Sequence, residues 1–124
     1  MTNKSFNLGL LILRLGFSGM MLTHGIPKIS SLFESPIKFA DPIGVGETTS
    51  LILALIGEVV APVLVLIGFK TKWATIPVII TMAVAAFVVH ASDPIGVKEK
   101  ALLYLIGFAA IFLTGPGKYS MDGK

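Results

Sequence analysis

Long apolar segments alternate with short polar ones along this chain. The apolar segments cover about residues 6–26, 48–69, 73–91 and 99–114. Each is close to the roughly 20 residues that a helix needs to cross the hydrocarbon core of a bilayer. Pro27 follows the first segment and the sequence GPG at 115–117 follows the last, as expected where helices end. The pattern predicts an all-α fold, an integral membrane antiparallel four-helix bundle.

Composition limits what else the chain can contain. Of its 124 residues, 54% are hydrophobic and 14% are charged, and the mean hydropathy is +0.87. Soluble domains rarely have this composition, and four spans leave room only for short connections. We therefore expect a single transmembrane domain over residues 1–124. The net charge of +3 comes largely from lysines at segment ends, which argues against nucleic acid as a partner.

Two connecting regions need a separate interpretation. The N-terminal segment has no small-x-small cleavage site and Arg14 interrupts it, so we expect a retained helix rather than a signal peptide. The loop at 27–47 is long for a small protein, and it mixes Phe33, Ile37 and Phe39 with polar residues. We expect this loop to lie in the membrane interface and to cover part of a pocket.

An even number of helices places both termini on the same side of the membrane. The basic turn at 70–72 directly adjoins two helices on that side, so the positive-inside rule favours a cytoplasmic N-terminus and C-terminus. The lysines divide into Lys4, Lys70, Lys72, Lys118 and Lys124 on this side and Lys28, Lys38, Lys98 and Lys100 on the other.

Arg14 and Glu58 each lie near the middle of a predicted helix. A charge at mid-membrane costs at least about 2.5–3.5 kcal/mol, so each is expected to have a partner. Opposite charges at similar depth on consecutive antiparallel helices predict a buried ion pair between Arg14 and Glu58. The pair either only fixes the register of the helices or forms the polar floor of a ligand pocket.

Two histidines lie at a similar predicted depth, toward the outer face. His24 ends the first helix and His90 ends the third, and Lys28 lies close to His24 in the sequence. Either histidine could simply be a hydrated interfacial residue. We predict instead that His24, His90, Arg14 and Glu58 converge on one cavity that opens toward the outer interface.

Few chemistries fit these residues. A metal site is disfavoured, because no Glu-x-x-His motif is present, and the chain has no cysteine for thiolate ligands or disulfides. No dinucleotide, phosphate-loop or nucleophile-elbow motif is present, so no cofactor is evident. A quinone needs hydrogen-bond donors for its carbonyls and an apolar slot. Histidine, arginine and Tyr104 among Phe and Met residues offer both.

Several stretches together resemble one known family. They are LRLGFSGMMLTHGIPKI, the GE pair in the second helix, LIGFKTKWA, VVH and KEKALLYLIGFAAIFLTGPGKYSMD. The chain resembles the DoxX family of small four-helix bacterial membrane proteins over almost its whole length. Some members are linked to quinone-dependent thiosulfate oxidation, others to quinone or catechol detoxification or to thiol-based oxidative-stress complexes. The positions that match the family are Arg14, His24, Lys28, Glu58 and His90.

The resemblance implies a multi-pass protein of the bacterial cytoplasmic (inner) membrane. The leading interpretation is a protein that binds a quinone-like lipophilic molecule or supports a quinone-linked oxidoreductase complex, with a redox partner protein or a second copy of itself as partner. The alternative is a non-catalytic membrane subunit or scaffold in which the buried charges are structural. The missing cysteines argue against a direct thiol-redox role, and the short chain leaves little room for a transporter.

Overall fold

The computed structural model describes residues 3–37 and 39–123, and this part of the chain is helical with no strands. Lys38 and Lys124, which the topology prediction counts, lie outside it. The elements in order are α1 (Asn3–Gly25), the 3-10 helix η1 (Ile26–Phe33), α2 (Glu47–Leu55), the π-helix η2 (Ile56–Val60), α3 (Ala61–Ile67), α4 (Thr71–Val84), the π-helix η3 (Ala85–Val89) and α5 (Ile95–Thr114).

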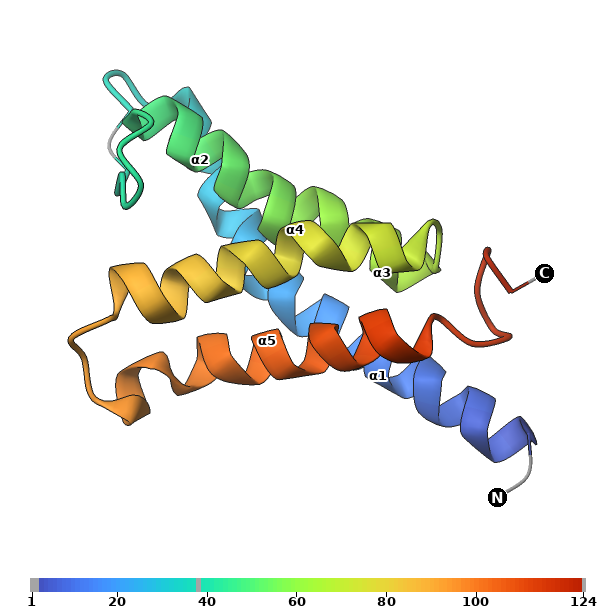
Figure 1. The fold of residues 1–124 in the computed structure, drawn as a ribbon. Coiled ribbons are helices and arrows are strands. Elements are labelled where there is room, and N and C mark those ends of the chain that lie inside the picture. The colour runs from blue at the N-terminus through green and yellow to red at the C-terminus, as the bar shows by residue number, and fades with distance from the viewer. Residues whose placement is uncertain (1–2, 38, 124) are drawn as a thin grey trace.

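Within the described residues, three continuous helical segments are long and apolar enough to cross a membrane. They are Asn3–Phe33, Glu47–Ile67 and Thr71–Val89. The last helix, α5, carries Lys98, Glu99 and Lys100 near its start, so its apolar part is confined to residues 101–114. In Figure 1, α4 and α5 lie side by side as a hairpin that crosses α1 and the α2–α3 segment. The start of α1 and the C-terminal tail lie at one end of the molecule, which we call the terminal end.

The helices begin and end at somewhat different residues from those predicted. Helical structure continues past Pro27 as η1 to Phe33, where the sequence predicted a loop. Proline is tolerated in the first turn of a helix, because the N–H that it lacks has no partner there. Pro94 likewise precedes α5, which begins at Ile95 rather than at 99.

Both π-helices lie within membrane-length segments. In η2 the N–H of Ala61 donates to the carbonyl of Ile56, five residues earlier. Pro62 follows directly and has no N–H to offer the carbonyl of Glu58, so the ordinary α-helical ladder is interrupted here. In η3 the N–H of His90 donates to the carbonyl of Ala85 over 3.0 Å. Such single-turn π segments are frequently found at functional sites.

The hydrophobic core joins α1, α3, α4 and α5. It is built from Met21, Ala61, Val65, Ala74, Val78, Met82, Tyr104, Phe108 and Ile111. Gly57 allows η2 to touch α4, because a side chain at this position would overlap the Thr81 side chain. Gly25 similarly allows the end of α1 to approach the backbone of Glu58. These two close contacts fix η2 between its neighbouring helices.

Arg14 is fully buried, and backbone carbonyls satisfy it. Its Nε donates to the carbonyl of Pro116 over 3.0 Å, and its Nη1 donates to those of Val65 at 3.1 Å and Leu66 at 2.8 Å. Its Nη2 donates to the carbonyl of Tyr119. The predicted ion pair between Arg14 and Glu58 is therefore wrong. Carbonyls in the last turn of a helix have no α-helical N–H partner and carry partial negative charge, so the end of α3, together with the tail, supplies the acceptors that the prediction assigned to Glu58.

The C-terminal tail folds back over the C-terminal end of α3 and the N-terminal end of α4. The N–H groups of Met121 and Asp122 donate to the carbonyls of Ile67 at 3.1 Å and Gly68 at 2.8 Å. The Asp122 carboxylate in turn accepts from the Lys70 N–H, the Thr71 N–H and the Thr71 hydroxyl, each at 2.8 Å. We call Arg14 together with residues 115–123 the tail clasp.

Two further features favour the tail clasp. Burial alone would raise the pKa of Asp122, but the hydrogen bonds from Thr71 and Lys70 outweigh it and hold that pKa below its usual value. The carboxylate is therefore charged at neutral pH, at the N-terminus of α4, where a negative charge is favourable. Gly68 has a φ of +73° and lies against Ser120, so the turn after α3 has no room for a side chain.

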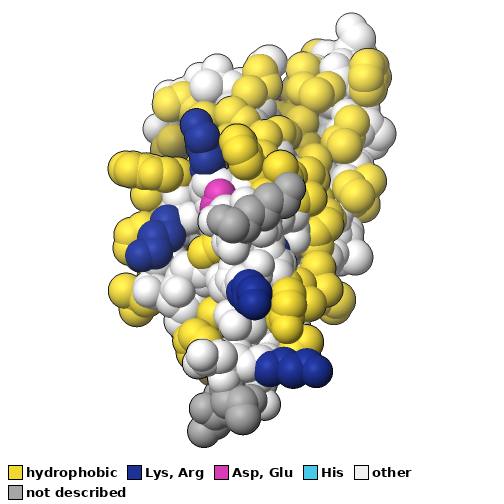
Figure 2. Space-filling model, turned by 90° about the vertical axis from the view of Figure 1, so that its right-hand side faces the viewer, with side chains coloured by type: hydrophobic (Ala, Val, Ile, Leu, Met, Phe, Trp, Pro, Cys, Tyr) yellow, Lys and Arg dark blue, Asp and Glu magenta, His cyan; other side chains and the backbone are white. Residues whose placement is uncertain are grey.

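The terminal end is mainly basic. Figure 2 shows basic side chains spread over this face, with little acidic surface among them, and they are lysines because the one arginine, Arg14, is buried. The exposed lysines that belong to this end are Lys4, Lys70, Lys72 and Lys118.

We predict that Arg14→Met lowers the stability of the protein and releases the tail. Methionine is similar in length to arginine but apolar, so the buried carbonyls lose their charged donor. One such hydrogen bond contributes about 1.5–3 kcal/mol to the free energy of unfolding. Chemical unfolding of the purified protein in detergent should show at least this loss, and a protease should cleave residues 115–123 faster. Lys4→Met removes an exposed charge at the same end of the molecule but outside the tail clasp, and is the control. Equal stability of the two variants would contradict the tail clasp.

Candidate functional site

A cavity lies between α1, η2, the α4–η3 segment and α5, at the end of the molecule opposite the tail clasp. Its volume is about 280 Å³. Its polar lining consists of His24, Glu58, His90, Lys100 and Tyr104, and its apolar lining consists of Met21, Met82, Ala85, Val97 and Ala101. We call it the polar cavity.

Aromatic packing holds His24 and Tyr104 in place. His24 lies in the last turn of α1, and its ring meets the ring of Tyr104 edge to face, with centroids 5.7 Å apart and an interplanar angle of 82°. Phe17, two turns earlier on α1, meets Tyr104 in the same manner at 6.4 Å. Tyr104 is buried on α5. The imidazole and the phenol therefore form one preorganised pair on the cavity wall.

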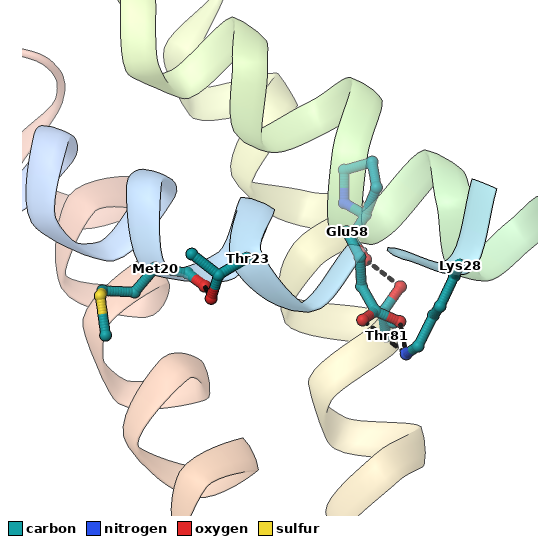
Figure 3. A network of polar contacts seen from close by, with 6 residues as sticks. Met20, Thr23, Lys28, Glu58 and Thr81 are labelled. Atoms are coloured by element: carbon teal, nitrogen blue, oxygen red, sulfur yellow. Dashed lines mark hydrogen bonds and ion pairs between the residues drawn. The ribbon is translucent and has the colours of Figure 1, made fainter. Parts of the chain in front are cut away.

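Glu58 is buried in η2 and is paired with Lys28. The Lys28 Nζ donates to both carboxylate oxygens of Glu58, at 2.7 and 2.8 Å. Figure 3 shows Lys28 reaching from η1 to the carboxylate, next to Thr81 on α4. Because Gly25 lets the end of α1 lie against the Glu58 backbone, η1 begins within reach of this carboxylate. A lysine in the predicted interfacial loop thus neutralises the acid.

His90 lies just after η3, at the mouth of the polar cavity. Its Nδ1 is 2.8 Å from the Oδ2 of Asp93, and both side chains are partly exposed. A carboxylate bound to one ring nitrogen orients the imidazole and leaves the Nε2 for another partner. Asp93 and Lys100 are absent from the sequence-based set of site residues. The His-x-x-Asp spacing across a turn was the available signal for Asp93.

A second cavity adjoins the first. Its volume is about 570 Å³, and its lining is mostly apolar, from residues 39–43, α2, η2, α4 and η3. Glu58, Ala85 and His90 line both cavities, whereas Lys28 lines only the second. We call it the apolar cavity.

The structure distributes the predicted site residues over three places. His24, Glu58, His90 and Tyr104 line the polar cavity, and Lys28 reaches Glu58 from the side of the apolar cavity. Arg14 belongs to the tail clasp and is not part of either lining. That any of these residues binds a ligand stays a prediction.

Comparison with known proteins identifies the family of the chain. A protein of Bacillus subtilis (strain 168) named "Putative oxidoreductase CatD" is 30% identical over 121 residues, which cover 97% of this chain and 89% of that protein. An "Uncharacterized protein" of Haemophilus influenzae is 30% identical over 122 residues, which cover 93% of this chain and 89% of that protein. No solved structure matches the chain. The family model described as DoxX matches residues 9–91, and the chain belongs to the DoxX family.

Proposed function

We propose that this membrane protein binds the head of a quinone-like lipophilic molecule in the polar cavity and supports a quinone-linked redox or detoxification complex. The observation that carries the proposal is the polar cavity itself. His24, Tyr104, His90 and Lys100 bring hydrogen-bond donors to one space that is otherwise lined by methionine and small apolar side chains. The similarity to a protein named as an oxidoreductase supports the same class of chemistry.

The donors suit a flat molecule with two carbonyl groups. Tyr104 and the histidines can each donate a hydrogen bond to a carbonyl oxygen, and Lys100 adds a positive charge near the opening. Met21 and Met82 are flexible and polarizable, so they can pack against the faces of an aromatic ring. Since a buried polar group without a partner is costly, these side chains favour an occupant that accepts hydrogen bonds.

The proposed setting is an antiparallel bundle of four helices in the bacterial inner membrane, with α5 as the fourth span. The charged start of α5 then lies at the outer interface beside the polar cavity, and the basic terminal end faces the cytoplasm. A quinone in the bilayer would reach the polar cavity from the outer leaflet. A partner protein, or a second copy of this chain, would exchange electrons with it there.

A second candidate function is a non-catalytic membrane subunit or scaffold. The pairing of Lys28 with Glu58 and the carbonyl shell of Arg14 favour it, because both buried charges already have partners within the chain. In this case the charges would fix the helix register, and the cavities would hold lipid or water.

One prediction from this proposal concerns the orientation of the chain in the membrane. After residue 124, only a reporter that works in the cytoplasm should be active, and near Ser35 only a reporter that works outside the cytoplasm. The reason is that the basic terminal end is retained inside. Paired alkaline phosphatase and fluorescent-protein fusions measure this. The reversed pattern would place the polar cavity on the cytoplasmic side.

Another prediction concerns the contribution of the two histidines to quinone binding. His24→Ala and His90→Ala should each weaken binding of a soluble benzoquinone about ten-fold or more, since each removes a donor worth about 1–3 kcal/mol when its partner is left unpaired. Equilibrium binding to protein in lipid nanodiscs measures this, with folded protein checked by gel filtration. Thr114→Ala, which changes a polar residue far from the cavity, is the control. Unchanged affinity in both histidine variants would refute the proposed site.

A further prediction tests the Lys28–Glu58 pair, on which the second candidate function depends. Glu58→Gln should destabilise the protein by about 1–3 kcal/mol, less than for a fully buried pair because the Lys28 side chain is 36% exposed. Lys28→Met combined with Glu58→Gln should recover part of this loss, as a double-mutant cycle in chemical unfolding would show. Glu99→Gln, at an exposed acid, is the control. For the scaffold, quinone affinity would be absent in the wild type and in every variant.

A further inference from the structure

The apolar cavity has no role in the function proposed so far. We propose that it holds the hydrocarbon tail of the same molecule whose head occupies the polar cavity, so that the ligand is a long-tailed amphiphile and not a free ring. This inference rests on the proposed function and deepens it by naming the class of ligand.

The two cavities meet at one shared wall. Glu58, Ala85 and His90 line both of them. Glu58 lies in η2, Ala85 begins η3, and His90 follows η3, so residues at both π segments line the wall that the two cavities share. Ala85 is the smallest of the three side chains and carries no polar group. It marks the place where a chain of methylene groups could pass from one cavity to the other.

The two linings differ as the two ends of an amphiphile differ. The polar cavity presents five polar or charged side chains within about 280 Å³. The apolar cavity, at about 570 Å³, lies within the usual range for small-molecule sites and is mostly aliphatic. Its walls include Leu53, Ile56, Ile80, Val84 and Val89. Burial of a hydrocarbon tail against such walls is favourable roughly in proportion to the area removed from water.

The apolar cavity also has a route to the bilayer. Leu53, Ile56 and Ile80 on its walls are each at least 40% exposed, on the outer faces of α2, η2 and α4. A tail longer than the cavity can therefore continue into lipid between these helices. Lys28 and Glu58 in its lining neutralise each other, so neither of them opposes an apolar occupant as a free charge.

Photolabelling tests where the tail lies. The probe is a benzoquinone that carries a decyl tail ending in a diazirine, added to the purified full chain in lipid nanodiscs and irradiated. Mass spectrometry should locate the label on the walls of the apolar cavity, in the peptides that contain Leu53, Ile80 and Val84. A label found only on the outer face of α5, for example at Leu103 or Ile106, would overturn the inference because the tail would then leave on the opposite side.

Matched variants supply the second arm. Ala54→Phe fills the apolar cavity, while Ala110→Phe places the same group at another half-buried helical alanine outside both cavities. Ala54→Phe should weaken the decyl-tailed quinone at least about ten-fold and leave the tail-less quinone unchanged, and Ala110→Phe should change neither. If Ala54→Phe does not fold, Ile80→Trp, at an exposed wall position, replaces it.

The outcomes are distinguishable. If the tail-less quinone binds but the decyl tail adds no affinity, or if filling the cavity has no effect, the inference fails while the proposed function stands. If neither quinone binds the wild-type protein, both fail.

Discussion

This fold depends on one constraint: charged side chains that are buried away from water need partners within the protein. Two ionised side chains, Arg14 and Glu58, lie inside membrane-length helices, and each must find a partner that the bilayer cannot supply. The fold gives them different kinds of partner. Arg14 takes neutral carbonyls from the end of α3 and from the tail, whereas Glu58 takes a lysine from η1. Each solution ties together segments that are far apart in the sequence.

The two solutions also divide the molecule into two ends with different properties. At the terminal end, backbone carbonyls surround the Arg14 guanidinium, and Gly68 together with the Asp122 carboxylate closes the turn before α4. At the other end, the π segments interrupt the regular helix and leave space between the helices. The packed end would support the proposed binding site, because groups that are already held in place lose little further conformational entropy when a ligand binds.

The sequence alone predicted much of this organisation. Apolar length and the flanking turns indicated the helical segments. The depth argument predicted that His24, His90, Glu58 and Arg14 converge on one cavity; the first three line the polar cavity, and Arg14 does not. The error lay in the partner of Arg14. Charge complementarity favours an acid, but a helix end presents unpaired carbonyls whose position depends on tertiary packing, and sequence depth does not reveal this. Likewise, helical structure continues past Pro27 as η1, and it positions Lys28 next to Glu58. The loop-like composition of this segment did not predict this.

The sequence separation of the contacts around Arg14 has a consequence for biosynthesis. Its carbonyl partner Pro116 lies 102 residues further along the chain, and Tyr119 lies 105 residues further. The first helix must therefore enter the bilayer long before half of the groups that satisfy its cation have been synthesised. Until then the guanidinium must stay near the membrane surface or be shielded by the insertion machinery. Packing around Arg14 in α1 is thus completed only after Pro116 and Tyr119 have been synthesised.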